Sequence, residues 1–223
     1  MKNFKLLLYL SIAFLVVSCN KPNSSTNADS TAKELATEIS GMKTVMLEYK
    51  TSMNAEGITS ISSMKQWMDL KNDKLRVETE TTTEMNGSNT TLQSIMINTD
   101  GFSYIIDPQT NTAIKMNSSE SDENPAEMIK SEDEQTFRQM IEAEGGKVIG
   151  NEKFLGRNCI VIEMLDEGRT TKAWYYKGIL LKMTNDYYTM EATKFEENIS
   201  LPSSKFEIPS DITITEMPSI PEM

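Results

Sequence analysis

The feature that most constrains the fold is a period-two alternation of polar and apolar side chains, interrupted at short intervals by turn residues. Between Arg76 and Met85, charged side chains fall on one face and valine, threonine and methionine on the other. Such alternation is typical of a strand with one wet face. Turns this short join antiparallel neighbours, because a parallel crossover needs a dozen or more residues. The sequence therefore predicts a meander of about ten or eleven long antiparallel strands. The turn signals include Asn86-Gly87, Asp100-Gly101, Asp107-Pro108 and Lys177-Gly178.

A helical pattern interrupts the strands. Asn124 can cap a helix with Pro125 at its first position, and Gly145-Gly146 can end it. We expect residues 125–144 to be helical and to pack on the concave side of the sheet. We expect a second short helix at residues 31–39. The expected fold class is α+β, an open antiparallel half-barrel with helices covering its concave face. Helical spacing is seen in Met128, Ile129, Phe137, Met140 and Ile141.

The N-terminus reads as a secretory leader that ends in a lipidation site. Lys2 and Lys5 precede the apolar run Leu6–Val17, which is too short to span a bilayer. Val16-Val17-Ser18-Cys19 resembles the bacterial lipobox, whose cysteine carries acyl chains such as palmitate. Two or more such chains hold a protein stably at a membrane. We therefore expect a lipid-anchored envelope protein, by this resemblance at the periplasmic face of the outer membrane.

The expected domain organisation follows from these segments. Residues 1–18 are the leader, and residues 19–30 are the lipidated cysteine with a polar, disordered tether. Residues 31–215 form a single half-barrel domain, and residues 216–223 form a flexible C-terminal tail.

Composition argues against several classes of function. The chain of 223 residues has a net charge of −11, whereas nucleic acid needs a basic surface. The absence of histidine removes the commonest general base and most transition-metal sites. Ser-x-x-Lys occurs at Ser62–Lys65 and Ser40–Lys43, in or beside strand patterns and not on the helix that this motif needs. We expect no enzyme, no catalytic residue, no cofactor and no metal site.

Methionine is unusually frequent, with 16 residues. Its flexible side chain suits a surface that accepts variable acyl chains, so one interpretation is an apolar cavity with Trp174 in its wall. The equal alternative is a loosely packed β core. A thioether copper site is disfavoured, because four-residue spacing on a strand separates side chains by about 13 Å. The candidate ligand-binding residues are Met64, Met68, Met96, Tyr104, Phe137, Met140, Trp174, Tyr176, Met183 and Met190.

Short motifs in a fixed order carry a resemblance to a known family over about residues 40–210. They are Lys74-Leu-Arg76, Met96-Ile-Asn-Thr-Asp-Gly101, Leu155-Gly-Arg-Asn-Cys159, Trp174-Tyr-Tyr-Lys177-Gly and Phe206-Glu-Ile-Pro209. The chain resembles the outer-membrane lipoprotein-sorting superfamily, which comprises a soluble periplasmic carrier, its anchored receptor and uncharacterised secreted relatives. The resemblance implies an open half-barrel around an apolar cavity. Cys19 makes this chain anchored, like the receptor.

We therefore expect a lipid-anchored periplasmic protein that binds an acyl chain or lipid, with a role in envelope lipid or lipoprotein trafficking. The alternative is a protein-interaction or envelope-stress-sensing module of the same fold, with an unknown protein partner. A ligand binder keeps a cavity on the order of several hundred Å³, whereas an interaction module can fill it with its own side chains.

Overall fold

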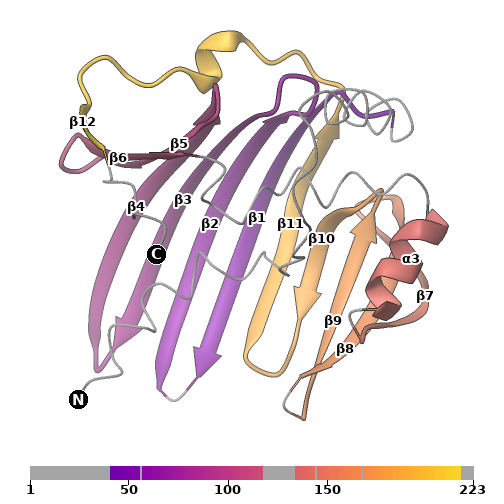
Figure 1. The fold of residues 1–223 in the computed structure, drawn as a ribbon. Helices are drawn as coiled ribbons and strands as arrows, with labels where there is room; N and C mark the ends of the chain where they lie inside the picture. The colour runs from indigo at the N-terminus through magenta and orange to yellow at the C-terminus, as the bar shows by residue number, and fades with distance from the viewer. Residues whose placement is uncertain (1–40, 56, 118–133, 144, 167, 217–223) are drawn as a thin grey trace, which may run out of the picture.

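The computed structural model describes residues 41–55, 57–117, 134–143, 145–166 and 168–216. They form one 12-stranded sheet with an α-helix and a 3-10 helix (Figure 1). The elements are β1 (Thr44–Ala55), β2 (Ile58–Asp69), β3 (Lys74–Met85), β4 (Ser88–Thr99), β5 (Phe102–Asp107), β6 (Thr112–Asn117), α3 (Glu134–Ala143), β7 (Lys147–Phe154), β8 (Arg157–Asp166), β9 (Arg169–Tyr176), β10 (Ile179–Thr184), β11 (Tyr188–Glu197), η1 (Ser203–Phe206) and β12 (Thr213–Glu216).

The sheet is open, with β12 at one edge and β7 at the other, in the order β12-β6-β5-β4-β3-β2-β1-β11-β10-β9-β8-β7. Its neighbours are antiparallel except β12, which pairs with β6 in parallel. The predicted antiparallel meander is present, but the sheet has 12 strands and not the expected ten or eleven. Two strand pairings were not predicted: β1 pairs with β11, and the C-terminal strand β12 pairs with β6 at the edge of the sheet.

The expected α+β class, with helices covering the concave face, is wrong. Among the described residues the only α-helix is α3, and it has 10 residues. A helix of this length spans about 15 Å, which is about three strand spacings. It packs at the β7–β9 end, where Phe137 lies 5.1 Å from Tyr175 between ring centroids. Residues 31–39 and 118–133, which include the rest of the predicted helices, lie outside the described residues.

The hairpin turns follow the predicted chemistry. Asn86 and Gly87 both have positive φ, at 54° and 77°, as a two-residue turn between twisted strands requires. Lys177 and Gly178 repeat the pattern, at 49° and 77°. Because β3 and β4 pair without a break on either side of the first of these turns, the register of this hairpin is fixed from Leu75↔Asn98 to Met85↔Ser88.

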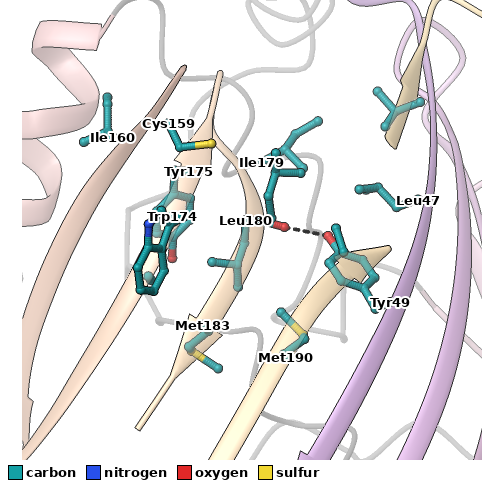
Figure 2. Close-up of a cluster of buried hydrophobic side chains, with 14 of the residues drawn as sticks. Leu47, Tyr49, Cys159, Ile160, Trp174, Tyr175, Ile179, Leu180, Met183 and Met190 are labelled. Carbon is teal, nitrogen blue, oxygen red and sulfur yellow. Dashed lines mark hydrogen bonds between the residues drawn. The ribbon is translucent and has the colours of Figure 1, made fainter. Parts of the chain in front are cut away.

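The register assigns every strand residue to one of two faces. We call the side of the sheet that carries Tyr49 the Tyr49 face and the opposite side the Trp67 face, since Tyr49 pairs with Met64 and Trp67 pairs with Met46 and Arg76. The main core lies largely on the Tyr49 face, where Leu47 and Tyr49 cluster with strand residues such as Tyr175, Leu180 and Met190 (Figure 2). Phe137 of α3 belongs to the same cluster. Tyr49 Oη donates a hydrogen bond of 2.6 Å to the carbonyl of Leu180.

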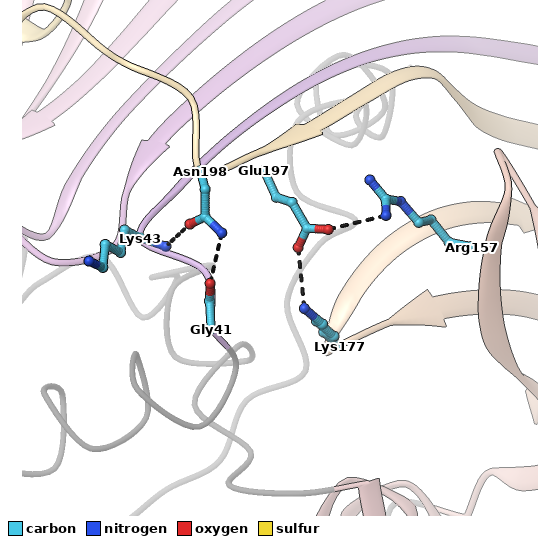
Figure 3. Close-up of polar contacts among 6 residues, drawn as sticks. All are labelled: Gly41, Lys43, Arg157, Lys177, Glu197 and Asn198. Carbon is cyan, nitrogen blue, oxygen red and sulfur yellow. Dashed lines mark hydrogen bonds and ion pairs between the residues drawn. The ribbon is translucent and has the colours of Figure 1, made fainter.

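Polar contacts link the residues before β1 to the residue after β11 (Figure 3). Asn198 accepts a hydrogen bond from the Lys43 amide and donates one to the Gly41 carbonyl, each 2.8 Å long. Next to it, Glu197 binds Arg157 at 3.2 Å and Lys177 at 3.3 Å. The Asn198 contacts join the start of β1 to the end of β11, and the Glu197 contacts join the end of β11 to Arg157 of β8 and to Lys177, which follows β9.

The C-terminal segment, residues 199–212, crosses from β11 toward β12 (Figure 1). On the Trp67 face, Ile208 and Ile212 pack against a small second core of Ile97, Ile106 and Ala113. Lys205 Nζ lies 3.6 Å from the centre of the Trp67 ring. The segment thus packs on the Trp67 face near Trp67, Ile97 and Ile106, and Ile61 on the same face of β2 stays 59% exposed.

Candidate ligand-binding surface

The Tyr49 face of β1–β4 carries no charged side chain along the full length of these strands. The Trp67 face of the same strands carries Glu48, Lys50, Lys65, Asp69, Lys74, Arg76, Glu78, Glu80 and Glu84. A quarter of the whole chain is charged, at 25%. We call the Tyr49 face of β1–β4, extended by Ile105 and Ile114, the uncharged surface.

Part of the uncharged surface is exposed, so core burial does not account for its composition. Met85, Leu92, Ile105 and Ile114 are 38–51% exposed. The same part of β3 does carry charge on its other side: Glu84, the residue after Thr83, points to the Trp67 face. Ile105 and Ile114 are cross-strand neighbours, and contiguous exposed apolar side chains mark a contact surface.

The apolar part of the uncharged surface is continuous with the core. One cross-strand row runs from buried Leu47 to exposed Ile114, and its members become more exposed with distance from β1. Met64 and Met96 are half-buried and pack against the core cluster. The row contains Leu47, Gln66, Val77, Met96, Ile105 and Ile114.

Five of the predicted residues share the Tyr49 face: Met64, Met68, Met96, Met183 and Met190. Phe137 reaches that face from α3 through its contact with Tyr175. The side chain of Met140 and the residue Cys19 are outside what the structure describes. The predicted pocket and its lining stay predictions.

Tyr104 and Trp174, expected with these methionines, lie on the Trp67 face. Tyr104 pairs with Ile97 and joins the second core beneath the C-terminal segment. Trp174 pairs with Lys182, whereas Met183 pairs with Ala173, because a bulge between Leu180 and Lys182 shifts the register. The Trp174 Nε1 donates a hydrogen bond of 2.8 Å to Glu152. This side chain is therefore anchored by its own polar partner on the Trp67 face.

Tyr176 lies at the end of β9 and makes an edge-to-face contact with Phe195, with 5.6 Å between ring centroids. The Arg157 guanidinium stands 5.4 Å from the Tyr176 ring and 5.3 Å from Phe195. Since Arg157 also binds Glu197, Tyr176 belongs to the cluster that fastens the strand ends.

The uncharged surface also includes residues that the prediction missed. These are hydroxyl side chains at its outer end and exposed aliphatic ones: Ser60, Ser62, Thr81, Thr83, Thr90, Leu92, Ile105 and Ile114. The signal that could have found them is the parity of charges: every charged residue of the first four strands falls at positions of one parity within its strand.

The tyrosines of the core are protected from ionisation by burial. Burial raises the pKa of Tyr49 above its ordinary value, and it raises the pKa of Tyr175 to about 12. Within the described residues, no three acidic or cysteine side chains gather as a metal site. In the same part of the chain, no helix is long and apolar enough to cross a membrane.

Comparisons with known proteins return structural similarity only. No family model and no curated protein matches the sequence. An uncharacterised conserved protein from Thermus thermophilus is 8% identical, with a TM-score of 0.49, covering 86% of this chain and 100% of that one. The MucA/MucB complex structure from Pseudomonas aeruginosa gives 10% identity and 0.47, covering 84% and 63%. LprF from Mycobacterium bovis gives 9% and 0.36, covering 81% and 99%. These values do not assign the chain to a family.

Proposed function

We propose that this chain is a cell-envelope binding protein that holds the acyl chain of a lipid, or of a lipid-modified molecule, against its uncharged surface. The observation that carries the proposal is the segregation of charge on β1–β4, where one face is charged and the other has none even at exposed positions. An acyl chain has no group that could pair with a charge, so it binds best where no charge has to lose its water.

The residue types on this surface fit an acyl chain. Met64, Met68 and Met96 have flexible, polarisable side chains that adapt to different chain conformations. Each buried methylene contributes about 0.8 kcal/mol, so about eight methylenes supply about 6 kcal/mol before the entropic cost of association. The proposal assigns no catalytic step and no cofactor.

The location is proposed from the leader and lipobox. Lipidation of Cys19 would anchor the chain, and the polar tether would let the sheet stand off the membrane. We expect Cys19→Ser to move the protein from the membrane pellet to the soluble periplasmic fraction. Persistence of the variant in membranes washed at high salt would remove the anchor from the proposal.

A protein-interaction module is the second candidate, and the sheet edge favours it. All four residues of β12 are exposed, and β12 leaves one edge of the sheet open. An extended segment of a partner could add a strand there. This candidate requires no acyl ligand, so the binding experiment separates the two.

Methionine methyl groups offer a direct readout of acyl binding. In full-length Cys19→Ser protein labelled with [¹³C-methyl]methionine, we expect decyl glucoside below its micelle concentration to shift the signals of Met64 and Met96. Met46 is the internal control, because it lies on the Trp67 face of β1, opposite Trp67. Shifts confined to Met46, or no shift with any C10 amphiphile, would remove the acyl-binding proposal and favour the interaction module.

A further inference from the structure

We infer that the ligand is an amphiphile with an uncharged, hydroxyl-bearing head group, held with its head over the serine and threonine end of the uncharged surface. The inference rests on the proposed function and specifies the ligand class. On this face the hydroxyl residues lie toward the distal turns of β2, β3 and β4, where Ile58, Met85 and Leu92 accompany them. Met64, Val77 and Met96 lie toward the opposite end of the same strands, beside the buried Gln66.

The hydroxyl groups are ordered in cross-strand pairs. Ser62 and Thr81 are 2.6 Å apart between hydroxyl oxygens, and Ser60 and Thr83 are 3.3 Å apart. Each hydroxyl has one donor and two acceptor positions, so one bond within a pair leaves capacity for a ligand. Thr90, directly opposite Thr83, extends this array onto β4. A head group with several hydroxyls can therefore bind more than one pair at once.

The absence of charge on this face selects against charged heads. A carboxylate, phosphate or ammonium that leaves water must find a partner of opposite charge, or its desolvation is unfavourable. No lysine, arginine, aspartate or glutamate points to this face from β1–β4. A hydroxyl-bearing head group exchanges hydrogen bonds with water for similar bonds with serine and threonine. The free energy of its transfer from water to this surface is therefore close to zero.

The spacing along β2 orients the ligand. Met64 and Ser60 lie on the same face four residues apart, which is about 13 Å along a strand. Met68 continues the apolar end for a further four residues. Met68 and Ser60 are only 4% and 9% exposed, so they support the surface from beneath. A single amphiphile aligned with the strands would thus place its tail against the half-buried Met64 and Met96 and its head beside the half-buried Ser62, Thr81 and Thr83.

The experiment compares three C10 probes of equal chain length in full-length Cys19→Ser protein: decyl glucoside, decanoate and decyltrimethylammonium, each below its micelle concentration. Affinity is read from the methyl shifts of Met64 and Met96. We expect decyl glucoside to bind at least about tenfold more tightly than either charged probe. The test variant is Ser62→Ala with Thr81→Val, which we expect to reduce this preference to about threefold or less.

The matched control is Thr82→Val with Thr91→Val, because this hydroxyl pair, 3.0 Å apart, lies on the Trp67 face of the same strands. We expect the control to keep the full preference. Equal affinity for all three heads, or a preference that survives in the Ser62/Thr81 variant, overturns the head-group inference while acyl binding stands. Absence of shifts with all three probes overturns the proposed function itself.

Discussion

Strands β8–β10 and the outer halves of β2–β4 differ in how far their two faces are buried. In β8, consecutive residues Cys159, Ile160, Val161 and Ile162 are all at most 8% exposed, so both faces are covered. In the outer half of β4, residues 88–93 are exposed on both faces. The first region holds the fold together with α3, and the second contributes little burial. The sequence of this half of β4 is therefore less constrained by the core, and Thr90 of the hydroxyl array lies in it.

The largest expected effect tests the buried region. Phe137→Ala removes the α3 side chain that packs on Tyr175 and is 2% exposed. We expect the free energy of unfolding to fall by about 3–5 kcal/mol, measured by urea denaturation. Leu92→Ala is the control in the outer half of β4, with an expected change of about 0.5 kcal/mol or less. Similar losses for the two variants would contradict the division into two regions.

Alkaline pH should destabilise the buried region through its tyrosines. Burial raises the pKa of Tyr175 from 10.0 to about 12, and burial also raises the pKa of Tyr49 and Tyr188. The native state keeps protons that the unfolded state loses above its own pKa, so stability is full below about pH 10 and falls as the pH rises beyond it. Tyr175→Phe should make this decline shallower in urea titrations between about pH 9.5 and 11. A decline of unchanged slope in the variant would sink this explanation.

The smallest expected effect concerns the C-terminal segment on the Trp67 face. Lys205 contacts the Trp67 ring and lies 3.6 Å from Glu78. Lys205→Met should reduce stability by about 0.5–1 kcal/mol and increase amide hydrogen exchange in residues 203–208. Lys194→Met is the matched control, since Lys194 forms an ion pair of 3.0 Å with Glu196 and is 46% exposed. Faster exchange in residues 203–208 of the control as well would show that the ring contact is not the cause.

Much of the fold could be predicted from the sequence, because its signals are local. Period-two alternation and turns such as Asn86-Gly87 determine where strands run and that neighbours are antiparallel. The helix signals from Asn124 onward were also local, and Glu134–Ala143 forms a helix, while residues 124–133 lie outside the described residues. Local propensity does not determine how much of a sheet a helix covers. The predicted fold class was wrong for this reason.

The candidate surface was predicted in part. Met64, Met68 and Met96 were selected for their residue type, and the register places them on one face. Trp174 was assigned to the wrong side because the bulge between Leu180 and Lys182 leaves no mark in the alternation. Tyr104 was grouped with the methionines by residue type, whereas its register opposite Ile97 places it in the second core on the Trp67 face.

The sequence by itself determined the strands, their turns and the separation of charge within β1–β3. These depend on side chains a few residues apart, so the pattern alone carries them. Only the tertiary structure decided that β1 pairs with β11, that β12 returns to β6, and that the charge-free faces of successive strands join into one surface. Those outcomes depend on register between residues distant in the chain, which packing settles and no local pattern records.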